Sequence, residues 1–298
     1  MTPEFGPPID VVRPESRSVP LVVSSPHSGC IYPPSLLSEV RLNLEQLRRL
    51  EDGCVDHLFG SAPEIGAPLL HARFARAYAD PNREAYELDT ELFEPPLPSY
   101  VNGSSAKARA GLGTIPSRIG GRAIYRARLS FDEVERRMRL AYWPYHHELQ
   151  RLLAATRAEF GTVLLLDCHS MPTLNGCGGG DAVDFALGDR FGRSCAPLIV
   201  ERAEAVLRAN GFKVARNRPY AGGYITTCYG QPQADVHALQ IEVRRGLYMD
   251  EATLRPHAAM LELKPILRQL LLELARVVGD SLVPSSQPGE RPMAVSVG

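Results

Sequence analysis

Two short apolar runs, each followed closely by a histidine, constrain the fold of this chain more than any other feature. Residues 19–25 are rich in valine and lead to His27, and residues 162–167 are rich in leucine and lead to His169. Continuous apolar runs of this length, bounded by Gly, Pro or Ser, predict strands that are buried on both faces. Ligands of open α/β sheets bind beyond the carboxyl ends of such strands, so we expect the two imidazoles to meet there.

Strands and helices are predicted to alternate along the rest of the chain. Further strands are predicted at 68–79, 182–187, 212–216 and 237–243, and helices at 44–59 (in two pieces), 131–160, 196–210 and 250–278. This order predicts a single-domain α/β fold, with a mixed, mainly parallel sheet flanked by helices on both faces. The domain is expected to span residues 19–279, between a loose N-terminal arm at 1–18 and a disordered tail at 280–298.

Composition and charge exclude several classes of partner. The formal net charge is −1, which gives no electrostatic case for binding nucleic acid or an anionic membrane. No run approaches the roughly 20 apolar residues that span a bilayer, and the first residues lack the features of a signal peptide. None of the six cysteines forms a C-x-x-C pair, which favours free thiols in a reducing cytoplasm. Nothing in the sequence indicates an oligomeric state.

The two histidines are candidate ligands of one metal ion. A catalytic zinc typically takes three protein ligands, histidine or carboxylate, and leaves one position for water. The third ligand should be a carboxylate near the same strand ends. Asp52, expected near the cap of the second helical piece, is preferred, and Asp56, one turn further on, stays open as the alternative.

Glu242 is the candidate general base, because its carboxylate interrupts the apolar alternation of the strand predicted at 237–243. A carboxylate that points into a core must be paired or functional. A purely structural ion pair with Arg244 or Arg245 is the competing interpretation.

Arginines near the strand ends favour an anionic substrate, because guanidinium binds carboxylates in a bidentate manner. Arg83 stands out because it follows Asn82 in a loop that closes the second predicted strand. Arg122 and Arg126 lie close together in a later segment and are further candidates.

The loop at residues 220–224 is a candidate to close over the ligand. Gly223 would let the backbone approach closely, and Tyr224 would follow it into the site. A simple turn is the competing interpretation of the two adjacent glycines.

Six motifs together resemble the N-formylglutamate amidohydrolase (N-formylglutamate deformylase) family. They are SPHSG at 25–29, DGCVDHL at 52–58, DPNR at 80–83, LDCHSMP at 166–172, NRPYAGGY at 217–224 and ALQIEVRRGLYM at 238–249. Each motif alone is weak, but six in this order are specific. The resemblance implies a fold like that of the zinc carboxypeptidases and aspartoacylases, of the phosphorylase/hydrolase-like type.

The resemblance also implies an activity: hydrolysis of N-formyl-L-glutamate, or a close N-acyl amino acid, in histidine breakdown, with one Zn²⁺ per chain. The relatives use two His and one acidic ligand, an Asn-Arg pair for the substrate carboxylate, and a glutamate base. The relatives place their acidic ligand three residues after the first His, where this chain has Cys30. Two alternatives stay open: an amidohydrolase for another acidic substrate, and a non-catalytic dicarboxylate-binding protein.

Overall fold

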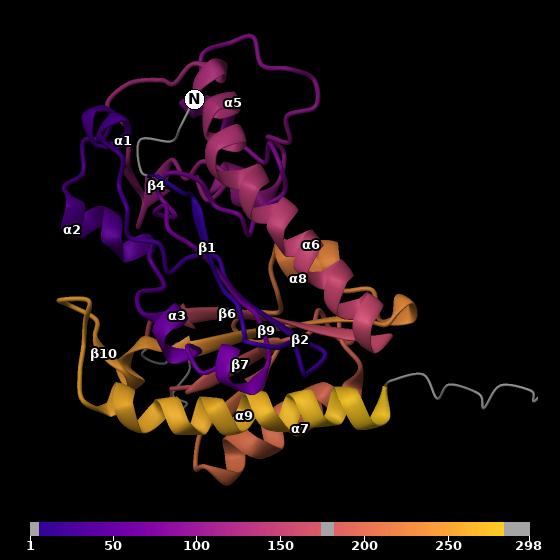
Figure 1. Ribbon diagram of the computed structural model, residues 1–298. Coiled ribbons are helices and arrows are strands. Elements are labelled where there is room, and N and C mark those ends of the chain that lie inside the picture. The colour runs from indigo at the N-terminus through magenta and orange to yellow at the C-terminus, as the bar shows by residue number, and fades with distance from the viewer. Residues whose placement is uncertain (1–5, 174–181, 283–298) are drawn as a thin grey trace, which may run out of the picture.

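The fold is a three-layer arrangement of helices packed on both faces of one mixed sheet (Figure 1). The computed structural model describes residues 6–173 and 182–282. The predicted α/β class with a mainly parallel sheet is confirmed. No helix of the described residues is long and apolar enough to cross a membrane.

Seven strands form the sheet in the order β1-β3-β2-β6-β9-β7-β8. β2, β3, β6 and β9 are mutually parallel, β1 pairs antiparallel with β3, and β7 pairs antiparallel with β9. The strands are β1 (Ile9–Val12), β2 (Leu21–Ser25), β3 (Leu69–Ala72), β6 (Val163–Met171), β7 (Phe185–Gly188), β8 (Val214–Arg216) and β9 (Val236–Arg244). Two small hairpins lie outside this sheet: β4 (Arg118–Ile119) with β5 (Arg122–Ala123), and β10 (Met249–Asp250) with β11 (Arg255–Pro256).

The α-helices are α1 (Pro34–Glu39), α2 (Leu44–Leu47), α3 (Val55–Leu58), α4 (Ala106–Arg109), α5 (Phe131–Arg137), α6 (Trp143–Phe160), α7 (Pro197–Ala209), α8 (Tyr224–Tyr229) and α9 (Ala259–Ser281). A π-helical turn, Met138–Tyr142, joins α5 to α6. Single 3₁₀ turns lie at Arg48–Leu50, Pro63–Ile65, Thr90–Leu92, Pro232–Ala234 and Arg245–Leu247.

The sheet separates two apolar cores. Helices α3, α7 and α9 cover one face, where they bury alternate residues of the strands such as Leu164 and Leu166. Helices α5 and α6 cover the other face, where they bury Val163 and Leu165. Figure 1 shows α7 and α9 together on one side of the sheet and α6 on the opposite side. Because both faces are covered, the central strands read as nearly continuous apolar runs.

Several predicted boundaries were wrong. Residues 9–12, within the expected loose arm, form the edge strand β1 on β3. The strand expected to stop at residue 167 continues to Met171, so His169 lies inside β6 and not beyond it. The predicted closing helix begins at Ala259, after a β10–β11 hairpin that occupies the stretch from residue 249 to 256. Helix α8 occupies part of the expected Gly-rich loop.

Two further expectations concern caps and thiols. Cys54, in the left-handed conformation with φ 62°, is the N-cap of α3, so Asp52, expected near the cap, lies two residues before it. All five cysteines in the described residues are free thiols. Cys177 and most of the expected tail, residues 283–298, lie outside the described residues.

Candidate metal centre and active site

The candidate site lies where the side chains of two neighbouring strands, β6 and β9, change from apolar to polar along one face of the sheet. On the face of the sheet covered by α6, the buried residues of β6 continue as Asp167 and His169, and those of β9 continue as Gln240 and Glu242. The parallel register sets His169 directly beside Glu242. Polar side chains at such depth are costly unless they are paired or used, so this end of the sheet is a candidate site.

Three buried side chains from three parts of the chain converge beside this row. Nδ1 of His27, Nδ1 of His169 and Oδ2 of Asp52 lie 3.0–3.2 Å from one another. Each of the three residues is 2% exposed. His27 lies just beyond β2, His169 lies in β6, and the Asp52 N–H donates to the carbonyl of His27 at 2.9 Å. Within the described residues, this is the one group of at least three His, Cys, Asp or Glu close enough to share a metal ion.

The outer nitrogens of both imidazoles contact carboxylates. Nε2 of His27 lies 2.8 Å from Oδ1 of Asp80, and Nε2 of His169 lies 2.9 Å from Oδ2 of Asp167. A proton on each Nε2 leaves both Nδ1 lone pairs aimed at each other and at the Asp52 oxygen. Carboxylates that hold the outer nitrogen in this way are typical of metal-binding histidines.

The spacing of the three inner atoms fits a metal ion. Tetrahedral zinc with bonds of 2.0–2.2 Å separates its ligand atoms by roughly 3.3–3.6 Å. The observed separations of 3.0–3.2 Å are slightly shorter than that range. Three lone pairs in a dry cluster repel one another unless a cation lies among them, so the donor set could hold a divalent metal.

Asp52 is held in its charged form. Oδ1 of Asp52 accepts hydrogen bonds from Ser170 at 3.1 Å and from Nη2 of Arg245 at 3.0 Å. Burial alone would raise the pKa of Asp52, but without a metal ion the His169 and His27 rings, protonated at Nδ1, would donate to it and hold that pKa well below its usual value. Arg245 therefore balances the charge of Asp52 in the cluster. The ion pair between Arg245 and Glu242, which was the competing interpretation of Glu242, is not among the contacts of Arg245.

Glu242 lies beside the cluster, and one of its two carboxylate oxygens accepts a hydrogen bond from the protein. Oε1 of Glu242 accepts from Nε2 of Gln240 at 2.7 Å, and Oε1 of Gln240 accepts from the Gly223 N–H at 2.7 Å. Burial raises the pKa of Glu242 to about 7, with the His169 ring lowering it and the Asp52 charge raising it. A carboxyl group with a pKa near neutrality is suited to accept and return a proton.

The turn at residues 80–83 delivers Asn82 and Arg83 to the same site. Nδ2 of Asn82 lies 3.1 Å from Nε2 of His169, and Oδ1 of Asn82 accepts from the Ile225 N–H at 2.8 Å. Arg83 donates from Nε to the Leu112 carbonyl and from Nη1 to the Asn82 carbonyl, both at 2.6 Å. The Arg83 side chain is 10% exposed, so its guanidinium is fixed by protein oxygens at the cavity wall.

Two residues of the α5–α6 region contact backbone carbonyls of this turn. Tyr142, in the π-helical turn, donates to the Arg83 carbonyl at 2.8 Å. His146 lies 2.9 Å from the Pro81 carbonyl through Nε2 and 2.8 Å from the Tyr229 hydroxyl through Nδ1. Burial lowers the pKa of His146 to about 4, so the ring is neutral at pH 7. π-Helical turns are frequent at functional sites, and here the turn orients the Arg83 backbone.

A cavity of about 280 Å³ opens onto these residues. Of the residues singled out from the sequence, it is lined by His27, Asp52, Asn82, Arg83, His169, Gly223 and Glu242. Tyr220, from the loop expected to close over the ligand, also lines it. The sequence analysis did not place Arg76, Lys107, Gln240 or Arg245 in the cavity, which they also line. Gln240 carried a usable signal, because it shares the period-two row of Glu242, whereas Lys107 comes from a segment with no periodic pattern.

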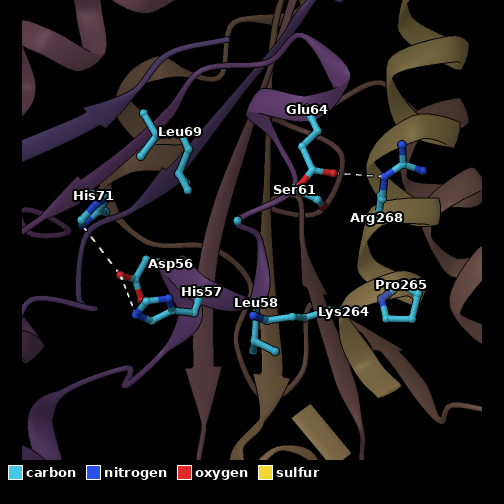
Figure 2. A pocket seen from close by; sticks show the side chains of 12 residues that line it. Asp56, His57, Leu58, Ser61, Glu64, Leu69, His71, Lys264, Pro265 and Arg268 are labelled. Atoms are coloured by element: carbon cyan, nitrogen blue, oxygen red, sulfur yellow. Dashed lines mark ion pairs between the residues drawn. The ribbon is translucent and has the colours of Figure 1, made fainter. Parts of the chain in front are cut away.

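Asp56, the alternative ligand, lies elsewhere. Oδ2 of Asp56 is 3.9 Å from Nε2 of His57 and 3.9 Å from Nδ1 of His71. Figure 2 shows these three side chains on the wall of a different cavity, which Lys264 and Arg268 of α9 also line. That cavity, of about 430 Å³, is larger than the one beside His27 but contains none of the cluster residues.

The two later arginines do not line the site either. Arg126 donates from Nε to the Val40 carbonyl at 2.8 Å and lines a separate surface pocket. Arg122, in β5, lines another. Tyr224 begins α8 directly after Gly223, with its ring 5.8 Å from that of His146, and is not among the residues that line the cavity.

Comparison with known proteins shows the family to which the chain belongs. A family model described as N-formylglutamate amidohydrolase matches residues 19–249. The chain belongs to the N-formylglutamate amidohydrolase family. The resemblance carried by the six motifs is thereby confirmed, and with it the prediction that the chain is an enzyme of a class that hydrolyses linear amides.

Individual relatives cover most of the chain. An N-formylglutamate deformylase from Pseudomonas aeruginosa is 34% identical over 263 residues, which are 86% of this chain and 91% of the relative. An N-formylglutamate deformylase from Pseudomonas putida is 32% identical over 267 residues. A crystal structure of N-formylglutamate amidohydrolase from Ralstonia eutropha JMP134 is 38% identical, with a TM-score of 0.86 over 91% of this chain and 98% of that one. Gene product Atu2144 from Agrobacterium tumefaciens, 18% identical with a TM-score of 0.63, shares the fold.

Proposed function

We propose that this protein hydrolyses N-formyl-L-glutamate to L-glutamate and formate, with one zinc ion held by His27, Asp52 and His169. The observation that carries the proposal is the convergence of three buried lone pairs, 3.0–3.2 Å apart, beside the buried carboxyl group of Glu242. Family membership and the names of the relatives support the formyl substrate.

Zinc bound there would polarise the formyl carbonyl and lower the pKa of the attacking water. Glu242 accepts the proton of that water as its oxygen adds to the formyl carbon. When the carbon–nitrogen bond breaks, Glu242 returns the proton to the leaving amine. Formate and the free amino group of glutamate are the products, so one water is consumed and the protons balance.

Asn82 and Arg83 bind and orient the substrate in this proposal. Nη2 of Arg83, which lies 3.7 Å from Oδ2 of Asp80, would also face a substrate carboxylate, while Nε and Nη1 stay bonded to protein carbonyls. Gly223 lets the backbone approach the site, because any side chain there would meet Asn82. A guanidinium fixed in this way loses little conformational entropy when it binds a carboxylate.

The test is Glu242→Gln, which preserves shape and removes the proton acceptor. We expect turnover of N-formyl-L-glutamate to fall by at least about 100-fold with zinc content unchanged. Glu262→Gln, on the exposed face of α9, is the matched control and should retain full activity. Wild-type turnover by Glu242→Gln would refute the assignment of the base.

A kinetic panel of N-formyl, N-acetyl and N-succinyl amino acids separates this proposal from an amidohydrolase for another acidic substrate. A preference for the formyl group supports the proposal, and a preference for a larger acyl group refutes it. Stoichiometric zinc together with turnover excludes a non-catalytic dicarboxylate-binding protein.

A further inference from the structure

The proposed substrate carries two carboxylates, but the arginines expected to help Arg83 bind them lie outside the cavity. Arg122 and Arg126 line other surface pockets. The remaining cationic side chains of the cavity are Arg76, Lys107 and Arg245. The contacts of these three decide which of them is available to an anion.

Both arginines are already committed to carboxylates of the protein. Arg245 donates to Asp52 at 3.0 Å and to the Glu51 carbonyl at 2.7 Å. Arg76 donates from Nε to Oδ2 of Asp80 at 2.8 Å, and Asp80 in turn holds His27. Each arginine therefore neutralises a carboxylate that braces the ligand cluster.

Lys107 has no such partner. No carboxylate of the described residues forms an ion pair with its ammonium group, although it lies in a cavity with Arg76 and Arg83. The pKa of Lys107 is lowered by partial burial and by the charges of Arg83 and Arg76. Arg76 and Arg83 share the single carboxylate of Asp80. Three cations around one carboxylate leave a positive excess on this wall, which favours the binding of an anion beside Lys107.

The backbone ties Lys107 to Arg83. The Leu112 carbonyl accepts from Nε of Arg83 at 2.6 Å, and the Leu112 N–H donates to the Lys107 carbonyl at 2.9 Å. Ser105 caps the short helix α4, which carries Lys107, by accepting from the Ala108 N–H at 2.9 Å. This segment, which has no periodic pattern in the sequence, thus holds a lysine at a fixed place beside Arg83.

The burial of the two cations parallels the distances of the two carboxylates of an acidic amino acid from its amide nitrogen. Arg83 is 9% exposed and follows Asn82, which contacts His169, whereas Lys107 is exposed at the rim. In an N-acyl glutamate the α-carboxylate is two bonds from the amide nitrogen and the side-chain carboxylate is four bonds from it. The deeper cation therefore suits the α-carboxylate, and the outer one suits the side chain.

We propose that Lys107 is a specificity-determining residue that binds the side-chain carboxylate of the substrate and so selects N-acyl amino acids with acidic side chains. This inference rests on the proposed function, because it assumes that an N-acyl amino acid occupies the cavity.

The test measures binding, so that it does not depend on turnover. In the zinc-loaded Glu242→Gln protein, calorimetry compares N-formyl-L-glutamate with its neutral isostere N-formyl-L-glutamine, with and without Lys107→Met. We expect Lys107→Met to weaken binding of the glutamate compound by about 10-fold and binding of the glutamine compound by less than about 2-fold. Lys107→Arg should keep the preference, and Lys264→Met, in the cavity of Figure 2, should leave it unchanged.

An unchanged preference for the glutamate compound in Lys107→Met overturns the inference, as does an equal loss for both compounds. Failure of the proposed function has a different signature, because the wild-type enzyme would then hydrolyse neither compound whatever Lys107 does to their binding.

Discussion

Replacing Gly223 with alanine should disable the site by displacing Asn82. An ideal Cβ at Gly223 would lie 2.6 Å from Cγ of Asn82 and closer still to its Oδ1 and Nδ2. Carbon atoms in contact prefer separations of about 3.5–4.0 Å, so the carboxamide must move by about 1 Å. That movement breaks its hydrogen bond from Ile225 and its contact with His169.

The expected magnitude follows from these contacts. Overpacking costs about 1–3 kcal/mol and the lost hydrogen bond about 1 kcal/mol, so the free energy of unfolding should fall by about 2–4 kcal/mol. A displacement of about 1 Å beside reacting groups can reduce kcat/KM by about 100-fold. Urea denaturation and steady-state kinetics with N-formyl-L-glutamate measure the two effects on the same protein.

Gly279→Ala is the matched control. No heavy atom lies within 4 Å of an added Cβ at Gly279, which lies in α9. Alanine there should stabilise the helix by up to about 1 kcal/mol and leave kcat/KM unchanged. Wild-type stability and kcat/KM for Gly223→Ala would refute the role assigned to this close approach.

Two further predictions concern the carboxylates around the cluster. Burial raises the folded-state pKa of Glu242 from 4.5 to about 7. As the pH rises between these values, the metal-free wild type should therefore lose stability relative to metal-free Glu242→Gln. The expected loss in the free energy of unfolding is on the order of 3 kcal/mol. Urea denaturation in chelator at pH 4.5 and pH 8 checks this, and a pH-independent difference would contradict it. Asp80→Asn and Asp167→Asn should each weaken zinc binding by about 10–100-fold in a competition titration, because each carboxylate holds a ring nitrogen. Asp56→Asn should bind zinc like the wild type, and an equal loss there would count against the assigned cluster.

The central strands could be predicted from sequence because their environment is uniform. β2 and β6 are buried on both faces, and burial on both faces favours an almost continuous apolar run. β9 is also buried, but its sequence signal was apolar alternation. Edge strand β1 could not be predicted, because its residues pair with β3 some sixty positions away and alternate between partly buried and exposed.

Helix α8 could not be predicted for a different reason. Its β-branched and aromatic residues have low intrinsic helix propensity. The helix is stabilised by tertiary contacts, since Ile225 is fully buried and donates its N–H to Asn82. Tertiary packing therefore overrides local preference at this position.

The proposed metal ligands and base could be predicted from the sequence more readily than the cationic residues that line the cavity. His27, His169 and Glu242 each follow or interrupt an apolar strand, a signal that the local sequence contains. Asp52 and Asp56 could be distinguished only in three dimensions, where the N–H of Asp52 meets the His27 carbonyl. Arg122 and Arg126 look like an anion site because they are close in sequence, but Lys107 and Arg76 come together only through folding.

The central claim is that His27, Asp52 and His169 bind one divalent ion. Anomalous diffraction at the zinc absorption edge, from crystals of the zinc-loaded protein, tests it most directly. We predict a single strong peak within bonding distance of Nδ1 of His27, Nδ1 of His169 and Oδ2 of Asp52. A peak beside Asp56, His57 and His71, or no peak at the cluster from a fully active enzyme, would contradict this account.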